Sequence, residues 1–243
     1  MPLIRQDEFN SVLEAVEDGA QTIHISGQPG VGKSTFLEDL AEELSTSYKT
    51  RILYVRKGNS PTTLTQYLLH KVRDAMGTTR ALLNKATGST LRVGPVSSGT
   101  STDDRATHLQ KLADISESVK VKKPLILFVD DIHKLDEPEI TRGYLRELLT
   151  NLGKNVHLII AGRLRYEDAD FNVYLGAFTR EETAECLRRD YPEAESETID
   201  DVYDKLNGHP YYLGLLTEAS GSDTFYEIPE EDARDFFPVR TTR

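Results

Sequence analysis

The chain has 243 residues, of which 38% are hydrophobic and 28% charged, and its formal net charge is −11. This balance is typical of a globular protein with one large domain, or with a core domain and a small one. The acidic charge argues against attraction of the whole surface to nucleic acid or anionic membrane, but leaves room for a local basic groove. The single cysteine, Cys186, cannot form an internal disulfide, and we find neither a bilayer-length apolar run nor a signal peptide. We therefore expect a soluble cytoplasmic protein.

Hydrophobic periodicity predicts alternating helices and strands in the first 177 residues. The predicted helices are residues 5–18, 33–47, 62–76, 104–119 and 140–152. The predicted strands are residues 21–26, 51–55, 124–129, 156–161 and 173–177. The run PLILFV at 124–129 is apolar throughout, which is typical of a central parallel strand covered on both faces. The alternation predicts an α/β fold with a doubly wound parallel sheet.

The pattern changes after Phe178, where only helices are predicted. Thr179 and Glu182 have the spacing of a capping box, and further helices are expected at 197–206 and 210–218. The predicted domains are an α/β core at 1–177, a small all-α lid at 178–220 and an acidic, aromatic-containing tail at 221–243. The tail is either a docking segment or a partly ordered terminus.

The segment 77–103 is rich in Gly, Ser and Thr and is expected to form an extended excursion or a small hairpin. A mobile surface loop and a functional segment are both open interpretations of it.

Residues 27–34, GQPGVGKS, match the pattern G-x-x-x-x-G-K-[ST] without deviation. The match follows a predicted strand and opens a predicted helix, the context in which such a loop cradles phosphates with its backbone N–H groups. Lys33 supplies a cation for the β and γ phosphates, and the Ser34 hydroxyl is suited to bind Mg²⁺. The predicted nucleotide-binding residues of this loop are Gly27, Gln28, Pro29, Gly30, Val31, Gly32, Lys33, Ser34 and Thr35. The sequence thus predicts binding of a nucleoside triphosphate, ATP, with Mg²⁺.

Two carboxylates follow the apolar strand at 124–129 and complete this prediction. Asp130, at the carboxyl end of the strand, is expected in the Mg²⁺ shell, through water. Asp131 is expected nearer the γ-phosphate, where it orients or deprotonates the attacking water; the alternative is that it only caps the following loop. Arg163 ends the next apolar strand, so either it contacts the γ-phosphate and stabilises the transition state or it is an ordinary surface arginine.

Together these residues resemble the AAA+-related STAND class of ATPases, which includes the NB-ARC switch proteins and the archaeal-type ATPases. The segment from Ile4 and Arg5 to Phe9 resembles the family's opening GR-x-x-E box, with Ile4 in place of the usual glycine. The sequence DDIH at 130–133 resembles the double-aspartate form of the second motif, and Gly208 to Pro210 resembles the G-x-P of the helical lid. Arg163 matches the family's sensor arginine.

The resemblance covers residues 3–218 and implies an ATP-binding P-loop NTPase core with strand order 5-1-4-3-2. It implies that Ile4 and Arg5 lie beside the adenine, that Pro210 packs near the base, and that the lid folds over the nucleotide. It also implies a switch whose ATP and ADP states differ in lid position or in oligomerisation. Two features depart from the family: the helix at 210–218 has no lid arginine, and no sensor or effector domain is evident after residue 220.

Three functions compete at this point. The leading expectation is an ATPase switch with slow hydrolysis, which acts on a protein partner or through self-association. A DNA-transacting ATPase of the origin-recognition or loader type is the alternative, but the only basic clusters are Lys120/Lys122/Lys123 and Arg163/Arg165. The third is a non-hydrolysing ATP-binding module. We find no N-K-x-D motif for guanine, and no arginine-rich acceptor lid of a nucleotide kinase.

Overall fold

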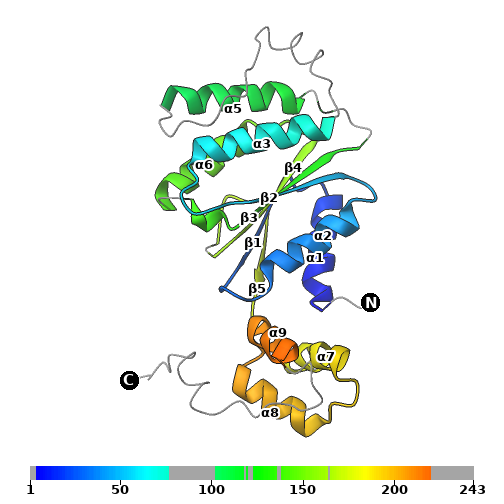
Figure 1. Cartoon of the computed structure of the whole chain (residues 1–243). Coiled ribbons are helices and arrows are strands. Elements are labelled where there is room, and N and C mark those ends of the chain that lie inside the picture. The colour runs from blue at the N-terminus through cyan, green and yellow to red at the C-terminus, as the bar shows by residue number, and fades with distance from the viewer. Residues whose placement is uncertain are drawn as a thin grey trace. The chain divides into compact units, whose positions relative to one another are not determined.

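The computed structural model of the protein describes residues 4–76, 102–117, 119, 123–135, 138–163 and 165–219. Five strands form one sheet in the order β2-β3-β4-β1-β5, which confirms the predicted order 5-1-4-3-2 (Figure 1). The strands are β1 Thr22–Gly27, β2 Lys49–Tyr54, β3 Leu125–Asp130, β4 Val156–Gly162 and β5 Phe171–Leu175. The pairs β1–β4, β2–β3 and β3–β4 are parallel.

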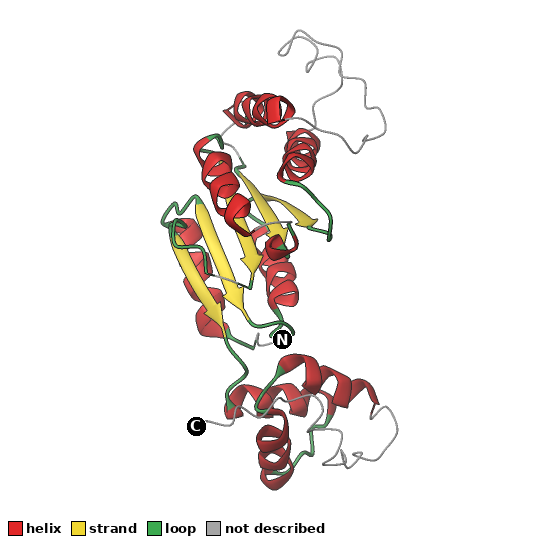
Figure 2. Ribbon diagram, turned by 90° about the vertical axis from the view of Figure 1, so that its left-hand side faces the viewer, coloured by secondary structure: helices red, strands yellow, loops and turns green. Residues whose placement is uncertain are grey.

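Helices cover both faces of the sheet, as the two views in Figures 1 and 2 show. The helices on one face are α1 Gln6–Glu17 and α2 Lys33–Leu44; on the other lie α3 Pro61–Met76, α5 Thr102–Glu117 and α6 Pro138–Thr150. All six residues of β3 are buried. Its alternate residues Leu125, Leu127 and Val129 pack into the core shared with α3, α5 and α6. The continuous apolar run of β3 therefore has the cause that the sequence predicts, because both of its faces are covered.

The register places the carboxyl ends of the central strands at one edge of the sheet. Tyr54 of β2 pairs with Asp130 of β3, and Ser26 of β1 pairs with Gly162 of β4. Polar residues that end these strands therefore lie along the edge where ligands bind in parallel α/β sheets.

Three helices follow the sheet: α7 Arg180–Asp190, α8 Ser196–Leu206 and α9 Pro210–Ala219. The predicted capping box is present, since the Thr179 side chain accepts from Glu182 N and the Glu182 side chain accepts from Thr179 N. Leu187, Ile199 and Leu213 are almost fully buried in a core of their own between the three helices. None of the helices that the structure describes is long and apolar enough to cross a membrane.

The chain divides into two compact units. The helical unit comprises Met1–Asp7, Gln28–Gly32 and Leu175–Arg243, and the sheet unit comprises Glu8–Gly27 and Lys33–Tyr174. The phosphate loop is therefore divided between the units: Gln28–Gly32 belong to the helical unit, whereas Gly27 and Lys33 on either side belong to the sheet unit. The predicted boundary at residue 177 stays a prediction, and the 77–103 excursion and the 221–243 tail lie outside the described residues.

Two local details differ from the sequence-based expectation. β5 runs from Phe171 to Leu175 instead of 173–177, because Asp170 accepts hydrogen bonds from the backbone N–H groups of Gln21 and Thr22 and starts the strand beside β1. A 3-10 turn, Ile132–Lys134, follows β3 directly. No hydrophobic period marks a turn of three residues, so the sequence gives no signal for it.

Candidate active site

The phosphate loop lies between the end of β1 and the first turn of α2. All six residues of β1 are buried, and α2 begins at Lys33. Gly30 and Gly32 have φ angles of 76° and 87°. These angles lie in the left-handed region, which side-chain-bearing residues rarely adopt. The backbone path of the loop itself therefore requires glycine at both positions.

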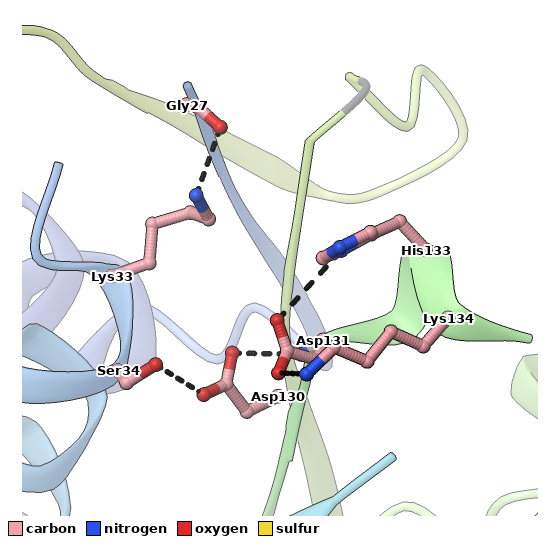
Figure 3. Close-up of polar contacts among 7 residues, drawn as sticks. All are labelled: Gly27, Lys33, Ser34, Asp130, Asp131, His133 and Lys134. Atoms are coloured by element: carbon pink, nitrogen blue, oxygen red, sulfur yellow. Dashed lines mark hydrogen bonds and ion pairs between the residues drawn. The ribbon is translucent and has the colours of Figure 1, made fainter. Parts of the chain in front are cut away.

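Figure 3 shows two side chains that hold the flanks of the loop. Lys33 Nζ donates a hydrogen bond to the carbonyl oxygen of Gly27 at 2.9 Å, so the lysine reaches across the loop. Ser34 Oγ donates to Asp130 Oδ2 at 2.6 Å and thereby connects α2 to the end of β3. Lys33 is only 8% exposed. A cation and a hydroxyl at these places are suited to phosphate oxygens and to a hard metal ion.

Asp130 is a buried carboxylate, 1% exposed, at the end of β3. Its Oδ2 accepts from Ser34 Oγ, and its Oδ1 accepts from the backbone N–H of Asp131 at 2.7 Å. Within the described part of the chain, no group of three or more His, Cys, Asp or Glu side chains could hold a metal. Mg²⁺ in nucleotide sites takes one or two protein oxygens and completes its shell with phosphates and water. The paired oxygens of Ser34 and Asp130 fit such an ion.

Asp131 adopts a left-handed backbone conformation, with φ of 59° and ψ of 33°. Its carboxylate forms an ion pair with Lys134 through Oδ2, and its Oδ1 lies 3.8 Å from His133 Nδ1 (Figure 3). The side chain makes no capping hydrogen bond to the 3-10 turn, so its contacts do not support a simple loop-capping role. A non-glycine residue in this conformation is uncommon and concentrates at functional sites.

Arg163 follows the last residue of β4 and is exposed. Its positive charge helps to lower the pKa of His133, which places the arginine near the turn after β3. Arg163 also borders a pocket of about 270 Å³. The other residues that line this pocket are Ser26, Arg165, Asn172, Val173 and Tyr174. The cation therefore lies at the same sheet edge as Asp130 and Asp131, as the sequence predicts.

The opening segment is anchored within the helical unit. Arg5 has a φ of 69° and donates from Nη2 to the carbonyl oxygen of Gly176 at 2.6 Å. Its guanidinium lies 4.9 Å from the centre of the Phe178 ring, at the distance of a cation–π contact. Ile4, which occupies the position of the family's glycine, is half-buried.

The apex of the phosphate loop belongs to the same unit as the lid helices. His209 Nε2 lies 3.1 Å from the carbonyl oxygen of Pro29, and the backbone N–H of Tyr211 donates to the carbonyl oxygen of Gly30 at 3.1 Å. Between these two donors, Pro210 is the first residue of α9. The G-x-P segment therefore holds the apex of the loop through two backbone carbonyls.

The predicted site residues are divided between the two units. The group in the sheet unit is Gly27, Lys33, Ser34, Thr35, Asp130, Asp131 and Arg163. The group in the helical unit is Ile4, Arg5, Gln28, Pro29, Gly30, Val31, Gly32 and Pro210. Their roles toward a ligand stay predictions.

Sequence reasoning missed four residues at these sites. Lys134 and His133 contact the Asp131 carboxylate, and His209 and Tyr211 contact the loop apex. The first pair could have been noticed, because both residues follow Asp131 within one turn. The second pair lies about 180 residues from the loop in sequence, and no local pattern connects them.

These features define a P-loop NTPase. They are the strand order of the parallel sheet, the glycine loop after β1, the lysine that reaches across this loop and the serine that bonds to the β3 aspartate. Residues 2–161 match the family model described as an AAA ATPase domain. The chain belongs to this family, and its class is that of the ATP-binding P-loop AAA+ ATPases. No curated protein sequence matches the chain.

Solved structures show the same fold at low sequence identity. A STAND protein with a tetratricopeptide repeat sensor from Pyrococcus horikoshii is 17% identical to this chain, with a TM-score of 0.60. The match covers 94% of this chain and 32% of the STAND protein. The Cdc6p protein of Pyrobaculum aerophilum is 12% identical with a TM-score of 0.58, covering 90% and 63%. The ORC1 protein of Aeropyrum pernix, solved in complex with DNA, is 13% identical with a TM-score of 0.61, covering 97% and 65%. The chain spans about a third of the first protein and just under two thirds of the other two.

Proposed function

We propose that the chain hydrolyses ATP to ADP and phosphate in a Mg²⁺-dependent reaction. The observation that carries this proposal is the hydrogen bond between Ser34 Oγ and Asp130 Oδ2 at 2.6 Å. It joins the first turn after the phosphate loop to the acidic end of the central strand, and these two oxygens would hold a Mg²⁺ ion that offsets phosphate charge. The Lys33 ammonium beside the Gly27 carbonyl supports the same assignment.

In this proposal each residue of the sheet-unit group has one task. Lys33 binds the β and γ phosphates, and Ser34 and Asp130 hold Mg²⁺, which offsets the charge of the phosphates. Asp131 orients the attacking water and accepts its proton. Arg163 contributes positive charge at the γ-phosphate as the bond to the leaving oxygen breaks.

We further propose that hydrolysis drives a switch. Two hydrogen bonds, from His209 and Tyr211, hold the carbonyls of Pro29 and Gly30. A nucleotide bound by the loop would change the environment of this apex, and with it the segment that begins α9. The proposed ATP and ADP states differ in lid position or in self-association, and the proposed partner is a protein or a second copy of the chain.

Calorimetric titrations with ATP and GTP, with and without Mg²⁺, followed by a phosphate-release assay, test this proposal. We expect ATP to bind more tightly with Mg²⁺ and to be hydrolysed slowly. Asp131→Asn should keep ATP binding within about threefold and reduce turnover by about 100-fold or more, in the range of a lost general base. Normal turnover in this variant would refute the role of Asp131. Tight ATP binding without phosphate release in the native chain would instead identify a non-hydrolysing module.

The DNA-transacting alternative is less well supported. The chain is acidic, with a net charge of −11, and the likeness to a DNA-bound ORC1 protein at 13% identity concerns the fold alone. Duplex DNA titrated into the ATP-bound protein at low salt should show no binding. Salt-dependent binding would restore this alternative.

A further inference from the structure

His133 is a half-buried histidine beside Asp131, and the proposed reaction gives it no role so far. It lies on the 3-10 turn that follows β3, and its side chain is 17% exposed. Both ring nitrogens are buried, and neither has a hydrogen-bond partner among the residues that the structure describes. Buried polar atoms without a partner are uncommon, because each costs about 1–3 kcal/mol of lost hydration. The hydrogen-bonding capacity of this imidazole is therefore unused among the described residues, at a position next to the Asp131 carboxylate.

The position of the His133 backbone is fixed by the turn that carries it. Asp131 is left-handed, and the backbone N–H of Lys134 donates to the Asp131 carbonyl oxygen at 2.8 Å, which closes the turn. Ile132 lies against Gly162 at the end of β4, so closely that a Cβ on that glycine would be 2.8 Å from Ile132 Cγ2. The turn is thus seated on the sheet edge, and His133 cannot move far from Asp131 without disturbing β4.

The two oxygens of the Asp131 carboxylate face different partners. Oδ2 pairs with the ammonium of Lys134, a side chain that is 42% exposed. Oδ1 lies 3.8 Å from His133 Nδ1, which is too far for a direct hydrogen bond. Once the ring turns enough to open Nδ1, one water can donate to both atoms at about that separation, with each hydrogen bond about 2.8 Å long. Its lone pairs then point away from both acceptors.

The charges around His133 favour its neutral form. Burial lowers the pKa of the ring, and the positive charges of Arg163 after β4, Lys134 on the same turn and Lys33 on α2 lower it further. Only Asp131 raises it. A neutral imidazole keeps one nitrogen as a hydrogen-bond acceptor, which an imidazolium does not have. Two of these cations, Lys33 and Arg163, are the ones that the proposed function assigns to the phosphates.

We propose that His133 positions the attacking water together with Asp131, an inference that rests on the proposed hydrolysis of ATP. The water donates one O–H to Asp131 Oδ1 and the other to the acceptor nitrogen of His133. Its oxygen forms a bond to the γ phosphorus while the bond from that phosphorus to the β–γ bridging oxygen breaks. The first proton passes to the Asp131 carboxylate, and His133 holds the second O–H without taking its proton. The products are ADP and inorganic phosphate.

The test compares His133→Ala with His133→Asn in the full chain. The Asn amide oxygen occupies nearly the place of Nδ1 and restores an acceptor, whereas Ala does not. We expect both variants to bind Mg·ATP within about threefold of the native chain, because neither removes a phosphate contact. The rate of single-turnover phosphate release should fall about 10–100-fold in His133→Ala, which is the range for loss of a group that positions water. In His133→Asn, at least half of this loss, on a logarithmic scale, should be recovered. The acid limb of the pH–rate profile should move to lower pH in His133→Asn, which has no imidazole to protonate.

His70→Asn is the matched control, since His70 lies on α3 with its side chain 72% exposed and pairs only with Asp74 among the contacts seen in the described residues. Release at the native rate in His133→Ala, with Asp131→Asn inactive, would overturn the role of His133 and leave the ATPase proposal intact. An ATP affinity that falls as much as the rate would also overturn it, because His133 would then act in binding. No release from the native chain would refute hydrolysis itself, and the proposal for His133 with it.

Discussion

The flanks and the apex of the phosphate loop are held by different kinds of interaction. At the flanks, functional side chains are engaged: Lys33 bonds to the Gly27 carbonyl, and Ser34 bonds to Asp130. At the apex, the carbonyls of Pro29 and Gly30 accept hydrogen bonds from the lid segment, and these belong to the helical unit. In the proposed function, the flanks of the loop bind the phosphates and the metal, whereas its apex couples the nucleotide to the segment that begins α9. Variants at the two places should therefore fail in different ways.

The largest effect is expected at the flank. Lys33→Ala removes the cation assigned to the β and γ phosphates, so the dissociation constant for Mg·ATP should rise at least about 100-fold. Calorimetry measures it, and far-UV circular dichroism should show an unchanged fold. Lys57→Ala is the matched control, because Lys57 is an exposed lysine in the loop before α3. Native-like ATP affinity in Lys33→Ala would remove the distinction between flank and apex.

The apex is tested by a pair of glycines that differ in the space around them: a Cβ on Gly30 would meet His209 and Tyr211, and a Cβ on Gly32 would meet neither. Gly30 and Gly32 both have positive φ, so replacing either by Ala costs about 1–2 kcal/mol in backbone strain. A Cβ on Gly30 would also lie 2.5 Å from His209 Cε1, whereas a Cβ on Gly32 meets nothing within 4 Å. Gly30→Ala should therefore lower the free energy of unfolding, without nucleotide, by about 1 kcal/mol more than Gly32→Ala.

A second substitution identifies the source of that difference. His209→Ala removes the ring that a Cβ at position 30 would strike, so the double variant Gly30→Ala/His209→Ala should be more stable than the sum of the two single effects predicts. Chemical denaturation of the four proteins gives this coupling free energy. If the two glycine substitutions destabilise the protein equally and neither is coupled to His209, the contact between His209 and the loop apex does not contribute to the free energy of unfolding.

These contrasts also show what the sequence can and cannot predict. The apolar run of β3 and the glycine–lysine spacing of the loop each depend on short-range rules, so the buried strand and the place of Asp130 at its end follow from the sequence. The sheet order was predicted only through the resemblance to the STAND ATPases. The contact of His209 with Pro29 depends on how the chain returns after α8. Helical periodicity says where α8 and α9 lie along the chain, but not which loop their connection touches.

The surroundings of Asp131 illustrate the same limit at shorter range. DDIHK shows two carboxylates, a histidine and a lysine within five residues, but only the left-handed angle at Asp131 turns His133 and Lys134 toward one carboxylate. Left-handed residues other than glycine are rare, and although Asp is enriched among them, most Asp residues adopt other conformations, so the residue type alone does not predict this angle. Residue identities therefore indicate the chemistry of this site, whereas its geometry had to come from the backbone.

The smallest expected effect concerns the strand that leads into the loop. His24 of β1 is 1% exposed, and its Nδ1 accepts a hydrogen bond from the backbone N–H of Tyr166 at 3.0 Å. Burial lowers its pKa from 6.5 to about 4, against an opposing hydrogen bond with Asn172. The unfolded chain therefore takes up a proton at this residue before the folded chain does. Its contribution to stability is complete above pH 6.5 and is lost as the pH falls toward 4.

Between pH 7.5 and 5.5 this linkage should lower the stability of the sheet unit by about 1 kcal/mol. Hydrogen exchange locates the effect. As the pH is lowered, the protection factors of the β1 amides should decrease, whereas those of the α8 amides should stay constant. His24→Asn keeps an acceptor for Tyr166 N but does not titrate, so its β1 protection should depend less on pH than that of the native chain. A parallel loss of protection in α8 would mean that the two units unfold together, and that flank and apex belong to one cooperative structure in spite of their different contacts.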